Sequence, residues 1–166
     1  MINPTLRIID VLISIFVLII FFPILFIISM LIIIIEGKPI FFKQTRIGYR
    51  GKKFNILKFR TMKNVVLKNE KLRLTSLGKT LRKTSLDELP QFVNVLKRDM
   101  SIVGPRPLPE NIENQIKKSI KLKRRKILPG ITGLSQINYT GKNRKLNSKL
   151  RLDIELINNY NLYNYF

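Results

Sequence analysis

Two adjacent carboxylates, Asp87 and Glu88, are the residues of this chain whose types and spacing are best suited to chemistry. Basic residues lie on both sides of them, at positions 82, 83, 97 and 98. The same segment fits a helix start, because Ser85 and Glu88 have the spacing of a capping box. Asp87 would then be a first-turn acid that complements the helix dipole. Pro90 favours a start nearer Leu86, which places the proline in the tolerated first turn.

The geometry of neighbouring helical residues limits what this pair can do. Their side chains point about 100° apart, so they cannot face each other across a scissile bond as glycosidase carboxylates do. Side by side they can take different roles, with one attacking a substrate and the other holding a metal ion or a proton. A helix N-terminus also attracts phosphate. Helix capping and chemistry both stay open on these residues alone.

The composition excludes several function classes. The chain has 166 residues and a formal net charge of +21, which indicates anionic partners such as phospholipid headgroups, phosphorylated substrates or nucleic acid. It contains no Cys and no His. Disulfides, thiol chemistry, the usual zinc sites and imidazole catalysis are therefore excluded. Carboxylates, Lys, Tyr or hydroxyl groups must do any acid–base or nucleophilic work.

Isolated cations in ordered segments are candidate ligands for an anionic substrate. Residues 104–107 form a loop stiffened by two prolines that presents Arg106, and a rigid arginine suits bidentate recognition of phosphate or carboxylate. Lys58 and Arg60 share one parity of a predicted strand. The alternative for each of these three residues is a solvated surface position.

One long apolar segment, residues 8–35, precedes these motifs. It is long enough to cross a bilayer, for which about 20 residues suffice. Hydropathy alone favours a single spanning helix, with the basic remainder in the cytoplasm. Pro23 lies near the middle and favours a kink, which could return the segment to the side it entered from.

The remaining chain predicts short elements. Residues 40–47 and 53–60 read as two strands joined by a turn at 48–51. Residues 64–83 are helix-compatible with an interruption at Gly78, and residues 89–100 have helical apolar spacing that predicts Leu89, Phe92, Val93 and Leu96 as core. Residues 110–127 read as a lysine-rich helix whose basic cluster at 121–126 could lie on anionic lipid. Residues 129–133 read as a second Pro/Gly loop, and residues 146–157 as a last helix.

The motifs together resemble a known family. Residues 85–91 and 94–107, with Phe-Arg-Thr-Met at 59–62 and Pro-Gly-Ile-Thr-Gly at 129–133, are similar to the core of the bacterial sugar transferases, which are monotopic phosphoglycosyl transferases. The resemblance is ungapped across the central motif and extends over most of the chain. It implies transfer of a phosphosugar from a UDP-sugar to undecaprenyl phosphate, with release of UMP.

The resemblance also implies roles for residues. Asp87 attacks the phosphate next to the sugar and holds the phosphosugar covalently. Glu88 assists as metal or proton partner, with Mg²⁺ bound by Asp87 and Glu88. Weaker candidates for polar contacts are Asn94, Asp99 and Gln136. The cations expected to bind phosphate are Lys58, Arg60, Arg82 and Arg106.

The architecture that follows is α/β, helix-rich with one short β-hairpin, and membrane-associated. Residues 1–36 are expected to form a re-entrant helix–break–helix near Pro23, and residues 37–166 a cytosolic catalytic domain with an apparently shortened C-terminus. The expected location is the bacterial inner membrane, with the catalytic domain on the cytoplasmic face and phospholipid as a partner, without nucleic acid. The alternatives are a membrane-anchored basic protein that binds anionic lipid or nucleic acid, or an inactive truncated family member.

Overall fold

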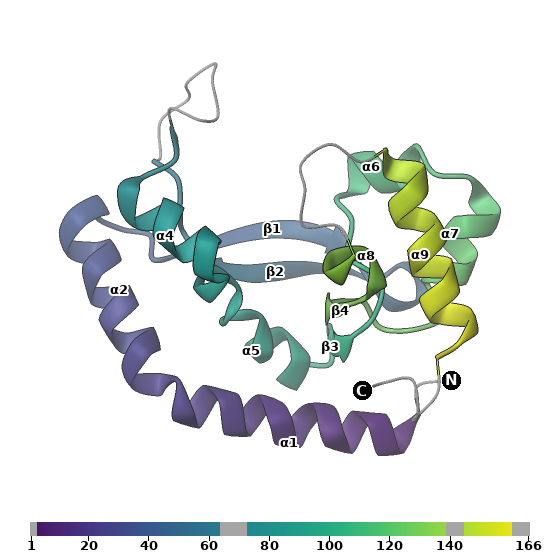
Figure 1. Ribbon diagram of the computed structural model, residues 1–166, viewed down its shortest axis with the longest axis horizontal. Helices are drawn as coiled ribbons and strands as arrows, with labels where there is room; N and C mark the ends of the chain where they lie inside the picture. Colours follow the sequence, from purple (N-terminus) through teal and green to yellow (C-terminus); the bar gives the residue numbers. More distant parts are fainter. Residues whose placement is uncertain (1–2, 64–72, 139–144, 161–166) are drawn as a thin grey trace.

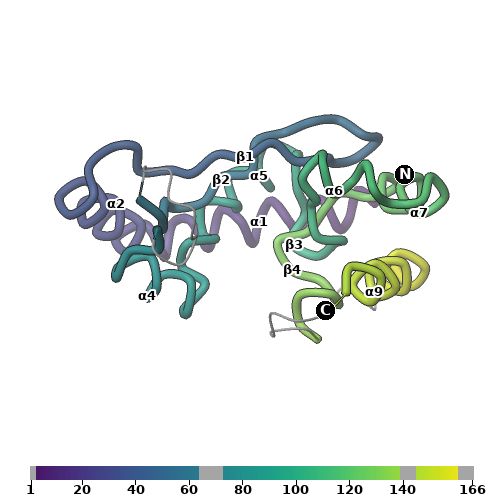
Figure 2. The backbone as a smooth tube through the Cα atoms, turned by 90° about the horizontal axis from the view of Figure 1, so that it is seen from above, coloured from purple at the N-terminus to yellow at the C-terminus, as the bar shows by residue number. Residues whose placement is uncertain are grey.

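The computed structural model describes residues 3–63, 73–138 and 145–160. A β-hairpin lies at its centre, with the N-terminal helices forming an arc along one side and the C-terminal helices gathered at one end (Figure 1). Seen from above, α1 (Pro4–Ile20) runs beneath the hairpin and α4 (Ser76–Thr84) lies beside it (Figure 2). The predicted helix-rich α/β class with a short hairpin is confirmed.

The apolar segment forms two helices, α1 (Pro4–Ile20) and α2 (Phe22–Glu36), bent by 61° at Phe21. Pro23 lies in the first turn of α2, where its missing N–H and its ring prevent α1 from continuing. In the part of the chain that the structure describes, neither helix is long and apolar enough to cross a membrane alone, and this bent pair meets the length and composition requirement only jointly.

Each of these two helices has a face that packs on the rest of the protein. Leu6, Asp10 and Ser14 are the buried residues of α1, one turn apart. Asp10 accepts hydrogen bonds from Ser101 Oγ at 2.8 Å and from the Ile102 N–H at 2.9 Å, so its carboxylate ties α1 to the strand that contains those residues. Asp10 is therefore buried between α1 and that strand.

The opposite faces of α1 and α2 are apolar and exposed. Among the described residues, their exposed large apolar side chains are Ile8, Leu12, Ile15, Phe16, Ile19, Ile20, Phe22, Ile24, Phe26, Ile27, Met30, Leu31, Ile34 and Ile35. An apolar surface of this extent marks a contact with another apolar phase or partner.

The hairpin forms close to where the sequence predicts it. Strands β1 (Phe41–Ile47) and β2 (Lys53–Phe59) pair antiparallel, with Phe41 opposite Phe59 and Ile47 opposite Lys53. The turn is a short 3-10 segment, Tyr49–Gly51. Phe59 on β2 packs with Ile28 and Ile32 of α2, so the hairpin and α2 share one hydrophobic cluster.

The segment around the two carboxylates departs from the predicted capping box. Helix α4 (Ser76–Thr84) runs directly into Ser85, which is left-handed with φ of 58° and whose side chain makes no capping bond. Leu86–Glu88 form a 3-10 turn (η2), and helix α5 (Gln91–Leu96) begins after Pro90. Ser85 therefore ends one helix instead of starting the next, because the chain must turn sharply between α4 and α5.

Gly78 lies inside α4 and does not interrupt it. A Cβ at this position would lie 2.1 Å from the carbonyl oxygen of Thr61, so only glycine allows α4 to approach that segment. The other part of this predicted helical stretch, residues 64–72, falls outside the described residues.

The predicted core face of α5 was wrong. The apolar positions Phe92 and Val93 are only partly buried and Leu96 is 37% exposed, whereas Asn94 is 1% and Val95 0% exposed. The side-chain amide of Asn94 explains this orientation. Its Oδ1 accepts from the Leu57 N–H at 2.9 Å and its Nδ2 donates to the Asn55 carbonyl at 2.9 Å, so α5 turns its polar face toward the backbone of β2.

A second sheet was not predicted. Strands β3 (Ser101–Val103) and β4 (Gly130–Thr132) pair in parallel, and the middle of the predicted Pro/Gly loop 129–133 is β4. The two chains approach so closely that a Cβ at Gly130 would lie 2.1 Å from the Gly104 nitrogen. Glycine at both positions is required by this contact.

The remaining helices cluster at one end of the molecule. Residues 110–127 form two helices instead of one, α6 (Glu110–Asn114) and α7 (Lys118–Arg124). The break lets buried Glu113 accept from Arg125 Nε at 3.2 Å. Helices α8 (Leu134–Ile137) and α9 (Leu146–Asn158) follow, and α9 confirms the predicted last helix.

The Asn94 contacts generate a stability prediction. We expect Asn94→Asp to lower the free energy of unfolding by about 1–3 kcal/mol or more at neutral pH. The new oxygen would face the Asn55 carbonyl and the Asp99 carboxylate, whose Oδ2 lies 3.4 Å from Asn94 Nδ2. Thermal unfolding in detergent measures the change. Asn114→Asp, at an exposed position with the same chemical change, is the matched control; equal melting temperatures for both variants would contradict the role of Asn94.

Candidate active site

A cleft of about 670 Å³ lies between the hairpin, the end of α4 and η2. It brings together side chains that are up to 67 positions apart in the chain, from Pro39 to Arg106. Six of the predicted site residues line it: Lys58, Arg60, Arg82, Asp87, Glu88 and Arg106.

Asp87 is the buried acid of the cleft, with 8% of its surface exposed. Burial raises the pKa of its carboxyl group, and the neighbouring Glu88 raises it further, while Lys58 and Arg82 oppose the shift. Desolvation raises the energy of the carboxylate, and the two cations lower it. A carboxylate of this kind is suited to attack an electrophile or to bind a cation.

Glu88 has a different environment although it is the adjacent residue. Its carboxylate forms an ion pair with Lys58 Nζ, which reaches it from β2. Both side chains remain partly exposed, at 18% for Lys58 and 29% for Glu88. The ion pair therefore lies at the wall of the cleft and is accessible to a further ligand.

Two arginines approach the cleft from different elements. Arg82, near the end of α4, donates from Nε to Thr61 Oγ1 at 2.9 Å, and its two terminal nitrogens take no part in this bond. Arg106 is exposed on the loop between two prolines, as predicted. A planar guanidinium on a rigid loop can bind two phosphate oxygens at once.

The loop of Arg106 is held by a buried ion pair. Arg124 of α7 pairs with Asp153 of α9, and the same guanidinium donates to the Arg106 carbonyl. Burial lowers the pKa of Arg124 to about 10, with Glu113 acting in the opposite direction. Helix α9 therefore supports the loop that presents Arg106.

Arg60 lines the cleft, but its guanidinium is bound to the end of α2. It donates from Nη2 to the carbonyls of Glu36 at 2.8 Å and Gly37 at 2.6 Å, and from Nη1 to that of Lys38 at 3.1 Å. A cation at a helix C-terminus satisfies carbonyls that have no helical partner. The structure thus gives Arg60 a role in fastening α2 to the hairpin.

Three predicted contact residues lie outside the cleft lining. Asn94 is bound to the backbone of β2, with Asp99 beside it. Gln136 lies on α8 and lines a small hollow that shares Arg46, Lys58, Glu88 and Arg106 with the cleft.

Sequence reasoning missed two residues of this region, Arg46 and Gln91. Arg46 donates to the Pro107 carbonyl at 3.1 Å and to Gln44 Oε1 at 2.6 Å. The signal was available in the strand pattern: the turn fixes the register that places Phe42 opposite Lys58, and alternate residues share a face, so Arg46 lies on the face of Lys58. For Gln91 the sequence contains no comparable signal.

The acidic side chains of the cleft can be assessed as ligands for a divalent cation. Within the described residues no group of three or more acidic side chains converges, so a cage made by protein alone is not indicated there. Mg²⁺ is commonly held by one or two carboxylates together with substrate phosphates. Asp87 and Glu88 fit that mode of binding.

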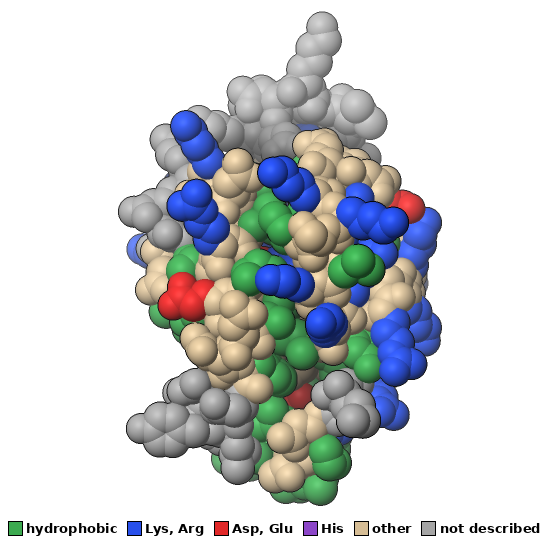
Figure 3. Space-filling model, turned by 90° about the vertical axis from the view of Figure 1, so that its right-hand side faces the viewer, with side chains coloured by type: hydrophobic (Ala, Val, Ile, Leu, Met, Phe, Trp, Pro, Cys, Tyr) green, Lys and Arg blue, Asp and Glu red, His purple; other side chains and the backbone are tan. Residues whose placement is uncertain are grey.

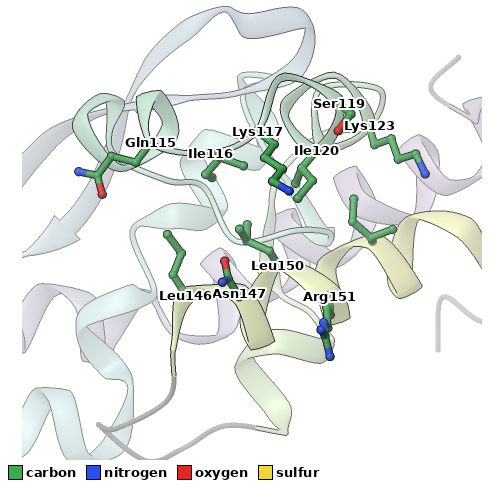
Figure 4. Close-up of a pocket in the computed structure, with 11 residues that line it drawn as sticks. Gln115, Ile116, Lys117, Ser119, Ile120, Lys123, Leu146, Asn147, Leu150 and Arg151 are labelled. Atoms are coloured by element: carbon green, nitrogen blue, oxygen red, sulfur yellow. The ribbon is translucent and has the colours of Figure 1, made fainter.

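A second depression, of about 630 Å³, lies between α7 and α9 and serves as a contrast (Figure 4). Its apolar lining residues are Ile116, Ile120, Leu146, Leu150 and Ile154, and its charged lining residues are Lys117, Lys123 and Arg151. No acidic side chain lines it among the described residues. It therefore lacks a buried carboxylate like that of Asp87.

The basic cluster at 121–126 is only partly available for lipid. Lys and Arg side chains are spread over the end of the molecule that carries α7 (Figure 3). Arg124 and Arg125, however, are turned inward to Asp153 and Glu113. Lipid contact therefore stays a prediction for Lys121, Lys123 and Lys126, because Arg124 is buried and Arg125 is paired with Glu113.

Comparison with known proteins agrees with this geometry. The family described as bacterial sugar transferase matches residues 2–166. A UDP-glucose:undecaprenyl-phosphate glucose-1-phosphate transferase of Escherichia coli (strain K12) is 37% identical over 169 residues, covering 93% of this chain and 36% of that protein. The uncharacterized sugar transferase EpsL of Bacillus subtilis (strain 168) is 44% identical over 139 residues, covering 76% of this chain and 64% of EpsL.

A third relative is matched over most of its own length. The exopolysaccharide production protein ExoY of Rhizobium meliloti (strain 1021) is 33% identical over 178 residues, covering 93% of this chain and 77% of ExoY. The chain spans less than two thirds of the E. coli and B. subtilis relatives. The match to the family extends across the hairpin, the cleft and α9 alike, and the chain therefore belongs to the bacterial sugar transferase family.

Proposed function

We propose that this chain transfers a phosphosugar from a UDP-sugar to undecaprenyl phosphate, releasing UMP, through a covalent bond between the phosphosugar and Asp87. The observation that carries the proposal is the position of Asp87, a buried carboxylate in a cleft lined by Lys58, Arg82 and Arg106. Names of relatives support the reaction class, since one from Aeromonas hydrophila is a UDP-N-acetylgalactosamine-undecaprenyl-phosphate N-acetylgalactosaminephosphotransferase, 33% identical over 165 residues.

The first half-reaction follows from the cleft. Asp87 Oδ forms a bond to the phosphorus next to the sugar, and the bond from that phosphorus to the bridging oxygen breaks. UMP leaves with the bonding electrons, and the phosphosugar stays on Asp87 as an acyl phosphate. Arg106, Arg82 and Lys58 compensate the charge that develops on the phosphate oxygens.

The second half-reaction restores the carboxylate. An oxygen of the lipid phosphate attacks the same phosphorus, and the bond to Asp87 breaks. The product is an undecaprenyl pyrophosphate sugar. Splitting one displacement into two lets donor and acceptor use the same small cleft in turn.

The position of the cleft suits a lipid-borne acceptor. Its lining begins at Pro39, just after α2, and includes Phe41 and Phe42, which are 41% and 44% exposed. The exposed apolar faces of α1 and α2 would lie in one leaflet of the inner membrane, with both ends of the bent pair at the cytoplasmic face. A protein that held anionic lipid by charge alone would need no buried carboxylate among its cations, so this alternative is not favoured.

Mg²⁺, bound by Asp87 and Glu88 together with the donor pyrophosphate, would neutralise charge on the leaving UMP. Glu88 keeps its carboxylate beside the reacting group through Lys58.

Single-cysteine labelling tests the membrane arrangement, and the natural absence of cysteine makes it clean. We expect Thr5→Cys, at an exposed position in the first turn of α1, to resist membrane-impermeant maleimide in intact cells and to react after permeabilisation. Lys43→Cys on β1 is the matched control, because it lies on the cytoplasmic side in either arrangement. Labelling of Thr5→Cys from outside would support a spanning segment instead.

Asp87→Asn tests the nucleophile. Wild-type protein given UDP-sugar without lipid should release UMP in a burst no larger than the amount of enzyme, and intact-mass spectrometry should find the phosphosugar adduct. The variant should lose burst and turnover by at least about 10³-fold, since an amide cannot form the acyl phosphate. Asp99→Asn, outside the cleft, should keep both. Full activity of Asp87→Asn, or an adduct on another residue, would rule out the assignment.

Metal removal tests the role of Mg²⁺. EDTA should abolish UMP release and added Mg²⁺ should restore it, because the pyrophosphate charge is otherwise not neutralised. Glu88→Gln should raise the Mg²⁺ concentration needed for half-maximal rate by about tenfold, since it removes one of two ligand carboxylates. Glu110→Gln, which breaks a surface pair with Lys53, is the control. Undiminished turnover in EDTA would exclude the metal.

A further inference from the structure

A small polar hollow opens off the cleft beside Glu88. It shares Arg46, Lys58, Glu88 and Arg106 with the cleft, and Gln91 and Gln136 line its other side. Its volume is about 20 Å³. A cavity needs about 10–15 Å³ to hold one water molecule, so the hollow admits one oxygen-sized group and no sugar ring or base.

Three residues of its lining each carry a buried nitrogen atom that finds no hydrogen-bond partner among the described residues: Gln91 Nε2, Gln136 Nε2 and Arg46 Nε. Gln91 is only 2% exposed, so water outside the protein does not reach its amide. Burying a donor without a partner is costly, and three in one lining are unusual. All three atoms are donors, so the group that satisfies them must be an acceptor.

The charges around the hollow decide which acceptor fits. Arg46 lies near Arg106, and burial together with that second guanidinium lowers the pKa of Arg46. The carboxylate in the lining, Glu88, is already paired with Lys58. A neutral carbonyl or hydroxyl would satisfy the amides but leave the two guanidinium groups without a counter-charge. A phosphoryl oxygen satisfies both requirements.

We propose that this hollow is a phosphoryl-oxygen subsite, in which Gln91 Nε2, Gln136 Nε2 and Arg46 Nε hold one non-bridging oxygen of a substrate phosphate whose remaining atoms lie in the cleft. The inference rests on the proposed function, which supplies two sources for that phosphate. One is the nucleotide phosphate that departs with UMP, and the other is the phosphate of the lipid acceptor. Either oxygen would be held beside Glu88, away from the phosphorus that Asp87 attacks.

Gln136→Glu tests the subsite with little risk to folding. The substitution keeps the size of the side chain and the oxygen that accepts from Ser135 Oγ at 2.9 Å, but it replaces the donor with a second oxygen. The new charge can pair with Arg46, so the melting temperature should not fall. Binding of the phosphate should weaken by at least about tenfold, because a donor has become a repelling acceptor.

Two arms of the experiment separate the sources. Calorimetry with UMP and with uridine isolates the contribution of the nucleotide phosphate. If Gln136→Glu lowers the affinity for UMP but not the affinity for uridine, the hollow binds the phosphate of the donor. An unchanged affinity for UMP with a KM for undecaprenyl phosphate raised by at least about tenfold assigns it to the acceptor. Gln136→Leu removes the donor without adding charge. It should change the same quantity, the affinity for UMP or the KM for undecaprenyl phosphate, by a smaller factor.

The matched control is Gln115→Glu, an exposed residue at one end of the groove between α7 and α9 that makes the same change in charge (Figure 4). If Gln136→Glu behaves like this control in both arms, the proposal is overturned and the hollow holds an ordered water only. Binding of UMP and of uridine needs no turnover. In a protein that releases no UMP, a changed ratio of these two affinities in Gln136→Glu would therefore support the subsite and refute the transferase function. A wild-type protein that binds neither UMP nor the lipid phosphate would refute both.

Discussion

The contact on which the rest of the structure depends is that of the Arg60 guanidinium with the C-terminal end of α2. Its three hydrogen bonds to the carbonyls of Glu36, Gly37 and Lys38 join the apolar helix pair to the strand that also carries Lys58. The packing of Phe59 against Ile28 and Ile32 reinforces the same junction. Because β2 forms one wall of the cleft, the position of the reacting groups is coupled to the position of the apolar helices.

A second constraint acts from the opposite end of the molecule. The close approach of Gly104 to Gly130 leaves no space for a side chain at either position. Two residues after Gly104, the Arg106 carbonyl accepts a hydrogen bond from Arg124, which is paired with Asp153. Segments from α7, β4 and α9 therefore determine where one exposed arginine stands. A buried ion pair is weak evidence for stability but a good device for fixing one arrangement. We regard its contribution here as positional.

In this basic chain, most of the acidic side chains bind donors within the protein. Most carboxylates of the described residues are engaged: Asp10 binds Ser101 and Ile102, Glu113 binds Arg125, and Asp153 binds Arg124. Glu88 holds Lys58 at the cleft wall. Asp87 differs, because burial dominates its environment and no ion pair with a described residue engages it within 4 Å. An excess of cations is thereby left for anionic ligands, with one buried carboxylate among them.

The sequence by itself determined the local features. The turn at 48–51 and the strand-forming segments on either side of it predicted the hairpin, Pro23 predicted the break, and the stiff loop predicted an exposed Arg106, because turns and kinks depend on neighbouring residues. Only the tertiary structure decided which faces are buried. It turned Asn94 toward β2, bound Arg60 to α2, and placed Gln91 beside Arg46. These outcomes could not be predicted from periodicity, since each polar side chain met a backbone or charged partner from a distant segment, and those contacts outweigh the apolar pattern of a six-residue helix.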